Sequence, residues 1–528
     1  METNDFSLKM KLNEYKNNIF NSRKYWIIYL ICISIIFLSL MDMNNYNHPK
    51  MEIIVFVLMS ILGIFFISFY HSNNQDKDFY KTVFIIIFIF GIVFSFLTPL
   101  FCTNDEFEHF VRAEITSNGV IFPEYNETAS FNVAGREYVG QFLTIQSASD
   151  LAEKGDDGQG IYFMDMVNAS IFNTNADTLP INYTPFPFFS AFAQNPFYGY
   201  IAPAIGMAIA KLLELNAVWL LWLGRIFNSL LYALLVSYAI KKTPILKMPL
   251  FVVACIPIAL SQAASVSIDP LINGLGILSI AYFLVLYKSP KKSIDYKPII
   301  KFSILILILG TCKVTYFCFI FLILFIPLEN FKEKKYYYYG LLSIIIILAI
   351  MVLWSKFYVD PGVHQSLRYA SSDSNARNTY NQINYILSHK KDTLIELSHV
   401  FNYLDGYLKF QSCFATGFTS LFLLFLGGVL FLYPHEKFKF KTKLGSLFVF
   451  LMLYIGTNFL FMVTWNSVGE LVPSGVQARY FLPALGLLPI CLGFNHMEGD
   501  KSQINQYILM ITITFIVTRI ATITTMVY

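Results

Sequence analysis

The residues best suited to chemistry stand in one run, TNDEFEHFVR, at residues 103–112. The Thr-x-x-Glu spacing at its start is that of a capping box and predicts that a helix begins here. On such a helix Asp105, His109 and Arg112 share one face, because they are separated by four and then three residues. A carboxylate beside cations could act as a general base next to a stabilised anion. The alternative is a juxtamembrane helix whose charges are only solvated.

Other ionisable residues fall within or beside apolar runs, where each costs about 2.5–3.5 kcal/mol and therefore needs a partner or a function. Each also has a structural explanation. Arg225 could pair with Asp269 and orient helices, Lys313 could reach the membrane surface, and Arg479 could anchor a helix end. Asp269 could cap a helix before Pro270. A function is favoured because all are expected on one side of the membrane: Asp105, Glu106, His109, Arg112, Arg225, Asp269, Lys313, Gln477 and Arg479.

Composition indicates the elements that must position these residues. Hydrophobic residues make up 56% of the 528 residues and charged residues only 14%. Apolar runs of about 20 residues recur, so we predict an all-α polytopic membrane protein with a bundle of about 11–13 transmembrane helices. The seven cysteines show no paired spacing, so neither a disulfide framework nor a cysteine metal site is expected. No cleavable signal peptide is evident.

The lysine clusters predict the topology, because basic residues favour the cytoplasmic side. They place the N-terminus in the cytoplasm and two long polar segments, 102–196 and 359–416, outside. The rule holds throughout only if Asn195–Leu215 does not cross and Phe302–Leu328 turns back near Lys313. The predicted helices are Tyr25–Met41, Met51–Tyr70, Thr82–Phe101, Ala217–Ile240, Pro249–Ser265, Ile268–Tyr287, Leu341–Phe357, Gly417–Leu432, Leu444–Val463, Tyr480–Phe494 and Tyr507–Ile523.

Three parts follow from this pattern. Residues 1–81 form a cytoplasmic segment and two accessory helices, 82–495 form the membrane core, and 496–528 form a last helix. No cofactor is certain. A divalent metal is possible at Asp156-Asp157, although such a pair beside glycines is usually a solvated turn. No nucleic-acid partner is expected.

A carboxylate flanked by buried cations at the outer face suits glycosyl transfer from a polyprenyl-phosphate sugar. The acceptor hydroxyl needs a general base. Lys or Arg would stabilise the departing phosphate. The donor's tail must lie in the bilayer while its sugar meets an acceptor in water.

The motifs add a resemblance. Residues 105–110, DEFEHF, resemble the Asp-Glu-x-x-His-Phe signature in the first outer loop of protein O-mannosyltransferases and related GT-C glycosyltransferases. The chain is more extensively similar to a bacterial membrane family, domain of unknown function 2142 (DUF2142), which itself resembles the GT-C group. Its patterns occur here in order, at residues 105–110, Asn195–Pro203, Gly224–Asn228, Pro257–Asp269, Cys312-Lys313 and Gln477–Pro483.

The resemblance implies a GT-C-like fold and a polyprenyl-phosphate donor. Asp105 is then the candidate base, with Glu106 beside it, and Lys313 and Arg479 are candidates for the leaving phosphate. The remaining candidates for substrate binding are His109, Arg112, Arg225, Asp269, Gln477 and Tyr480. The expected enzyme sits in a bacterial plasma membrane, with membrane lipid, a lipid-linked sugar and a surface glycan acceptor as partners.

Two other functions stay open. A transporter or flippase of lipid-linked saccharides would use the same charges to pass a phosphate, and would be expected to show internal repeats with broken helices. A non-catalytic partner in envelope assembly would use the outer segments to bind protein.

Overall fold

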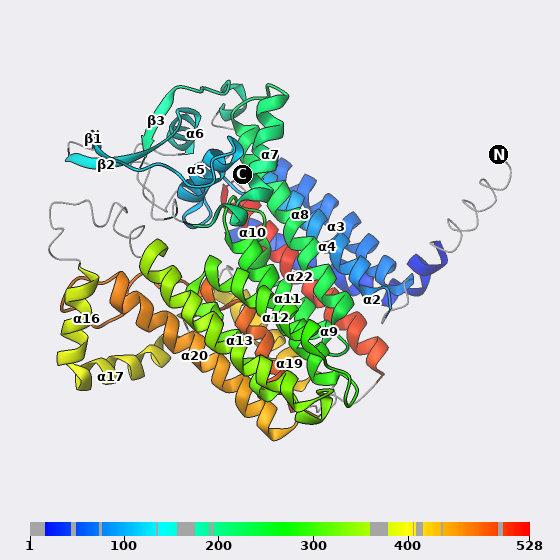
Figure 1. The fold of residues 1–528 in the computed structure, drawn as a ribbon. Coiled ribbons are helices and arrows are strands. Elements are labelled where there is room, and N and C mark those ends of the chain that lie inside the picture. The colour runs from blue at the N-terminus through cyan, green and yellow to red at the C-terminus, as the bar shows by residue number, and fades with distance from the viewer. Residues whose placement is uncertain are drawn as a thin grey trace, which may run out of the picture.

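The protein folds as a helical bundle that carries a smaller mixed region at one end (Figure 1). The computed structural model describes residues 16–43, 49–72, 77–133, 136–155, 175–188, 192, 195–359, 378–404, 406–407, 416–434, 437–494 and 500–527. Among these residues, eight helices are long and apolar enough to cross a membrane. The prediction of an all-α polytopic membrane protein is thus confirmed.

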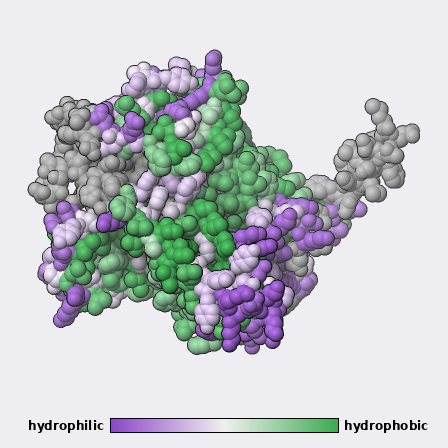
Figure 2. Space-filling model, viewed as in Figure 1, coloured by the Kyte–Doolittle hydropathy of each residue, from purple (hydrophilic) through white to green (hydrophobic). Residues whose placement is uncertain are grey.

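Each of the eight long helices covers one of the predicted apolar runs. They are α2 (Arg23–Met43), α3 (Pro49–Ser72), α4 (Phe79–Leu97), α8 (Val218–Lys242), α11 (Asp269–Lys288), α13 (Lys334–Trp354), α20 (Phe440–Thr464) and α22 (Lys501–Val527). Large apolar side chains remain exposed on their outer faces, such as Ile31, Ile61 and Ile345. Figure 2 shows an apolar band across the bundle, as expected for a surface that faces lipid.

Prolines divide two of the predicted helices into short pieces. The run predicted as Pro249–Ser265 forms α9 (Lys247–Ala254) and α10 (Pro257–Ala263). The run predicted as Tyr480–Phe494 forms η8 (Ala478–Phe481), η9 (Pro483–Leu487) and α21 (Leu488–Cys491). Proline lacks the backbone N–H that continues a helix, so it stands at the first or second position of each new piece, as Pro257, Pro483 and Pro489 do here.

The segment around Lys313 turns back, as predicted. Helix α12 (Tyr296–Cys312) ends at Lys313, which has an extended backbone (φ −151°, ψ 108°), and the 3₁₀ helix η3 (Val314–Phe325) follows. The two ends of this hairpin meet, because Ser293 and Ile294 donate backbone hydrogen bonds to Asn330. The chain therefore enters and leaves the bundle at the same end.

The segment predicted not to cross forms a short helix, α7 (Ile201–Leu212). Twelve residues span about 18 Å, which is too short for a bilayer core of about 30 Å. Lys211 near its end lies 2.7 Å from Glu114 on α5 (Glu106–Ser117). Helix α7 therefore packs with the predicted outer segment.

That segment also contains strands, which the sequence analysis did not predict. The antiparallel sheet has the order β1 (Asn126–Val133), β2 (Arg136–Ile145) and β3 (Pro185–Phe188). Helix α6 (Ser147–Gly155) follows β2, and the short turns η1 (Ala176–Thr178) and η2 (Phe197–Gly199) lead to α7. Figure 1 shows β1–β3, α5, α6 and α7 gathered at one end of the bundle.

The remaining elements surround the other side of the core. Helix α13 continues into one π-helical turn, η5 (Ser355–Val359), which is a rare element that occurs mainly at functional sites. The elements not yet named are η4 (Leu328–Asn330), α16 (Thr379–Ser388), α17 (Lys390–His399), η7 (Val400–Tyr403) and α19 (Thr416–Leu432).

Candidate functional site

Helix α5 begins at Glu106, but the predicted capping box does not form. The N-cap residue is Asp105, and its side chain makes no capping hydrogen bond. The Glu106 side chain points to Arg225 instead of back to the helix start. Asp105 adopts a left-handed backbone (φ 60°, ψ 14°), which is uncommon outside glycine. In this conformation the Asp105 carboxylate does not cap the helix. It pairs with a residue from another part of the chain instead.

That partner is Arg479. Its guanidinium binds the Asp105 carboxylate and lies 3.1 Å from the Asp269 carboxylate. The Arg479 side chain is 3% exposed, against 18% for Asp105 and 10% for Asp269. One cation therefore bridges two acidic side chains from different helices in a mostly buried site. The sequence analysis placed all three residues in one site, and the structure brings them into contact.

Amide side chains complete this bridge. Gln477 donates to Asp105 Oδ2 at 3.3 Å and accepts from Asn104 at 3.2 Å. Arg479 also donates to the Asn104 carbonyl at 2.7 Å. All of these contacts leave Asp105 Oδ1 without a hydrogen bond from the residues that the structure describes. One oxygen of this carboxylate is thus held while the other can accept a proton.

Glu106 and Arg225 form a separate buried pair. Arg225 Nε and Nη2 donate to the two Glu106 oxygens at 2.7 and 2.6 Å, and both side chains are fully buried. Arg225 also donates to the carbonyls of Thr98 and Pro99 at 2.7 and 2.8 Å. The predicted alternative of a pair between Arg225 and Asp269 is therefore wrong, since Glu106 takes that place. The pair fixes α5 against α8 and the end of α4.

His109 lies at the same end but binds Tyr200. Its Nδ1 is 2.6 Å from the Tyr200 hydroxyl, which accepts a hydrogen bond from Asn195 at 2.9 Å. Burial, together with the positive charge of Arg479, lowers the pKa of His109 to about 3. His109 stacks on Phe192, with ring centroids 4.2 Å apart.

Arg112 does not reach the bridge. It donates to Thr116 at 2.6 Å, to the Ile121 carbonyl at 2.9 Å and to the Asn195 carbonyl at 3.3 Å. These contacts tie the end of α5 to the chain around it. Asp105, His109 and Arg112 were predicted to share one helix face. In the structure each of them binds a different partner.

Lys313 comes from the break between α12 and η3. Its amino group lies 2.9 Å from the centre of the Tyr480 ring, a cation–π contact. The Tyr316 hydroxyl donates a hydrogen bond to the backbone carbonyl of Tyr480 at 2.7 Å, which helps to hold Tyr480 in place. Both Lys313 and Tyr480 were predicted site residues, and the structure places them together.

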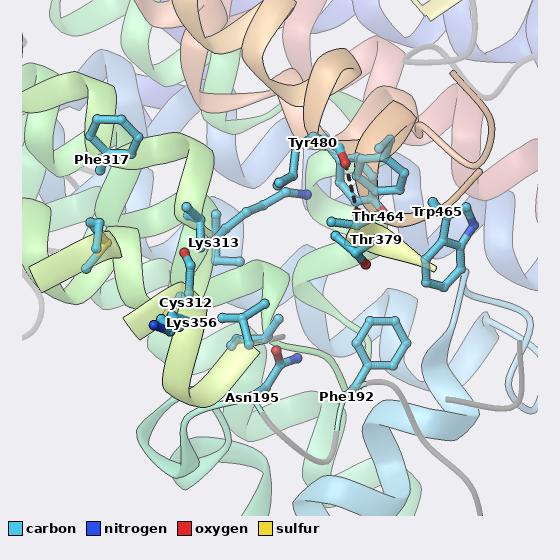
Figure 3. Close-up of a pocket in the computed structure, with 18 of the residues that line it drawn as sticks. Phe192, Asn195, Cys312, Lys313, Phe317, Lys356, Thr379, Thr464, Trp465 and Tyr480 are labelled. Carbon is cyan, nitrogen blue, oxygen red and sulfur yellow. Dashed lines mark hydrogen bonds between the residues drawn. The ribbon is translucent and has the colours of Figure 1, made fainter. Parts of the chain in front are cut away.

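These groups line a cavity of about 950 Å³. Figure 3 shows Lys313 extending across it toward Tyr480. The predicted site residues that line it are His109, Asp269, Lys313, Arg479 and Tyr480. Asp105 and Gln477 lie behind Arg479, while Glu106, Arg112 and Arg225 are packed away from the cavity.

The cavity has two different sides. In Figure 3, Phe317 lies on one side and Phe192, Thr379, Thr464 and Trp465 lie on the other. The first side is apolar along η3 and α13 through Val314, Phe317, Leu348, Met351 and Val352, and it ends in η5 at Ser355 and Lys356. The second side mixes hydroxyl groups with aromatic rings. The cations lie between the two sides, so the cavity suits a molecule with an apolar tail, an anion and a polar head.

The sequence analysis missed some residues that line the cavity and some that bind the residues around it. Asn104, Asn195 and Tyr200 lie inside the quoted motifs, so their positions were visible although their roles were not. Phe192, Thr379 and Trp465 come from segments without a distinctive local pattern, and only the fold brings them to the cavity.

The possible metal site at Asp156-Asp157 lies outside the residues that the structure describes. Within the described residues, no group of three or more His, Cys, Asp or Glu side chains could hold a metal ion. The charges that converge here are therefore carboxylates, lysine and arginine.

Comparison with known proteins places this arrangement in a family. A family model described as "Predicted membrane protein (DUF2142)" matches residues 88–488. The match covers more than half of the chain, so the protein belongs to this family. No curated protein and no solved structure matches the chain.

Proposed function

We propose that this DUF2142 member is an inverting glycosyltransferase that takes its sugar from a polyprenyl-phosphate donor. Its acceptor is a cell-envelope glycopolymer or glycolipid at the outer face of a bacterial plasma membrane. The observation that carries the proposal is the Asp105–Arg479–Asp269 bridge, whose Arg479 and Asp269 line, together with Lys313, a cavity with one apolar and one polar side.

The two sides of the cavity match the two ends of such a donor. The apolar wall formed by η3 and α13 would hold the first isoprene units, which cannot be solvated by water. The aromatic and hydroxyl side around Trp465 and Thr379 would hold the sugar, since aromatic faces pack against sugar C–H groups and hydroxyls pair with its polar groups.

The charged residues then have distinct tasks. The acceptor hydroxyl attacks the anomeric carbon, and its proton passes to the free oxygen of Asp105. The bond from that carbon to the phosphate oxygen breaks, and the polyprenyl phosphate leaves with the electron pair. Lys313 and Arg479 stabilise the charge that grows on the phosphate. Arg479 would move from the carboxylates toward the phosphate as the donor binds, which would also release Asp105 as a base.

The test is rescue of a strain that lacks this protein. Surface glycan is compared after complementation with the wild type, Asp105→Asn or Asp177→Asn at matched membrane levels. Asp177 is an exposed carboxylate in the predicted outer segment and serves as the control. Loss of one sugar from the deletion strain, restored by the wild type and D177N but not by D105N, is the expected result. Full rescue by D105N would remove Asp105 as the base and favour a transporter or an assembly partner.

A further inference from the structure

A second cavity lies apart from the charged site, between α12 and α13. Its volume is about 390 Å³, and twelve residues line it. They are Tyr296, Ile299, Ile300, Ser303, Ile304, Leu307, Tyr339, Leu342, Ser343, Ile346, Ile347 and Ile350. We refer to these residues as the α12–α13 groove. All but the two serines are apolar or aromatic, and several are half exposed, including Ile304 at 51% and Leu342 at 52%.

The groove runs along two helices that start side by side. The backbone pairing of residues 292–294 with 329–332 brings the first turns of α12 and α13 together. Tyr296 on α12 contacts Tyr336 on α13, with ring centroids 6.4 Å apart. The groove therefore has a defined end with aromatic residues, from which its apolar walls extend about 16 Å along the helices, at about 1.5 Å per residue.

Cations gather at this aromatic end. Lys297 and Lys301 are exposed on the first two turns of α12, and Lys332 and Lys334 are exposed at the start of α13. No side-chain hydrogen bond or ion pair joins any of these four to another residue that the structure describes. Figure 2 shows hydrophilic surface below the apolar band, at the end of the bundle where α13 begins.

The acidic residues nearby are engaged elsewhere. Glu329 binds Lys291 and Lys439 at 2.9 and 2.7 Å, and Glu333 binds Lys335 at 2.8 Å. Asp295 accepts a hydrogen bond from the Lys297 backbone, as the N-cap of α12. Glu333 also interacts electrostatically with Lys332, and Asp295 keeps its negative charge beside Lys297, so the four lysines form a rim that is partly offset but still net positive.

A buried hydroxyl lies between the rim and the apolar part of the groove. Ser303 Oγ has no hydrogen-bond partner among the described residues. It lies six residues beyond Lys297, about 9 Å along the helix axis. Ser303 therefore lies on the membrane side of the rim, where the ester carbonyls of a bound phospholipid would follow its phosphate, so Ser303 could donate to one of them.

From this arrangement we infer that the α12–α13 groove binds an anionic phospholipid from the membrane leaflet at its lysine-rich end. The acyl chains lie along the isoleucines, and the phosphate binds Lys297 and Lys301. The two tyrosines of the groove, Tyr296 and Tyr339, lie at the level of the headgroup. Basic rims beside apolar crevices between membrane helices favour acidic lipid headgroups over zwitterionic ones. This site is independent of the proposed glycosyl transfer and lies outside the residues assigned to it.

Native mass spectrometry of the purified full chain tests the inference. The protein is titrated in detergent with dioleoyl phosphatidylglycerol or dioleoyl phosphatidylcholine, and bound lipid is counted. The variants are K297Q/K301Q, which removes part of the rim, and Ile346→Trp, which fills the groove from a side chain that is already 48% exposed. The control is K241Q/K242Q, which loses two adjacent exposed lysines at the end of α8.

We expect the wild type and K241Q/K242Q to bind phosphatidylglycerol at least fivefold more strongly than phosphatidylcholine. K297Q/K301Q should lose that preference, and I346W should bind less of both lipids. Equal binding of the two lipids by the wild type would overturn the inference. So would unchanged phosphatidylglycerol binding in I346W, or an equal loss in both lysine variants.

Discussion

Arg479 donates a hydrogen bond to the carboxylate of Asp105, although the two residues are 374 positions apart in the chain. The same guanidinium lies 3.1 Å from Asp269. Two carboxylates that would repel each other are thus held together by one cation. The bridge connects the start of α5, the start of α11 and the 3₁₀ helix η8, so the site exists only when these three elements are in place.

The bridge should require arginine itself. Lysine keeps the charge of Arg479 but lacks the planar fork that reaches two carboxylates at once. We expect Arg479→Lys to lower glycosyl transfer at least tenfold and the free energy of unfolding by about 1–3 kcal/mol, because one buried carboxylate loses its partner. Transfer and thermal unfolding are measured in detergent. Arg23→Lys, at an exposed position, is the control, and an R479K protein that matches the wild type in both measurements would contradict the bridge.

Glu106 was predicted as a catalytic residue beside Asp105. Its contacts indicate a structural role for Glu106, whereas Asp105 keeps the proposed role of base. Glu106 is fully buried and binds Arg225 through both oxygens. Removing one member of a buried ion pair typically costs about 3–5 kcal/mol. We therefore expect Glu106→Gln to lower the thermal stability and membrane level, whereas Asp105→Asn should leave both nearly unchanged. A stable but inactive E106Q protein would restore the catalytic assignment.

The buried pair also offers a matched double variant for the same test. Glu106→Gln with Arg225→Met removes both charges and leaves an apolar side chain of similar length. The double variant should be more stable than E106Q alone, because no uncompensated guanidinium remains buried. Thermal unfolding in the same detergent compares them, and a further loss of stability in the double variant would show that Arg225 acts mainly through its carbonyl partners.

The neutral state of His109 predicts how stability depends on pH. The pKa of His109 is about 3 in the folded protein, against an ordinary value of about 6.5 when unfolded. Between these values the unfolded chain binds the extra proton, so acid should lower the free energy of unfolding as pH falls from about 6.5 toward about 3. The slope from this group is at most about 1.4 kcal/mol per pH unit.

The measurement is thermal unfolding of the wild type and His109→Gln at about pH 7 and at about pH 5, values chosen on either side of the ordinary histidine pKa of about 6.5. We expect the wild type to lose more stability than H109Q between the two values, because glutamine does not titrate. His389→Gln, at a partly exposed position between α16 and α17, is the control. Equal losses in all three proteins would show that His109 is not held neutral.

The parts of the fold set by local pattern were predictable from the sequence. Apolar runs gave the long helices, lysine clusters gave the return of the chain near Lys313, and the broken run at 195–215 gave a helix too short to cross. Partner choice was not predictable, because it depends on three-dimensional packing. The sequence analysis named Asp269 as the structural partner of Arg225, and only the packing of α8 against α5 shows that the partner is Glu106.

The residues that line the cavity were also only partly predictable from the sequence. Motif residues such as Lys313 and Tyr480 were predicted as site residues because charged or polar groups in apolar runs are costly. Trp465 and Thr379 give no such signal, since aromatic and hydroxyl residues are common near membrane surfaces. The strands β1–β3 were missed because the polar segment that contains them is rich in Gly and Asn and resembles irregular loop.

The topology remains a prediction that labelling can test. We predict that neither the α12–η3 hairpin nor the short helix α7 crosses the membrane. In that case Lys241→Cys and Lys332→Cys should react from the cytoplasm only. Tyr183→Cys, at a position 56% exposed in the predicted outer segment, should react from outside. A membrane-impermeant thiol reagent on intact and permeabilised cells distinguishes these cases, with the unsubstituted chain as background. Labelling of the K332C protein in intact cells would contradict the lysine rule here.

Helix α7 packs against α8 through a close backbone contact at Gly206. A Cβ at this position would lie 2.3 Å from the Leu223 carbonyl oxygen, and backbone cannot yield as a flexible side chain can. We therefore expect Gly206→Ala to push α7 from α8 and to lower the midpoint of thermal unfolding. Gly456→Ala is the matched control, because that helical glycine has no atom within 4 Å of an added Cβ.

The two glycines should respond in opposite directions. Alanine in an exposed helix interior is favoured over glycine by about 0.5–1 kcal/mol, so G456A should be neutral or slightly stabilising. If G206A were as stable as G456A, α7 and α8 would not be in backbone contact. Because α7 begins directly after Tyr200, which holds His109, a displaced α7 should also weaken the His109 contact. The smaller dependence of stability on pH expected for H109Q should then appear in G206A as well, which links the helix packing to the site.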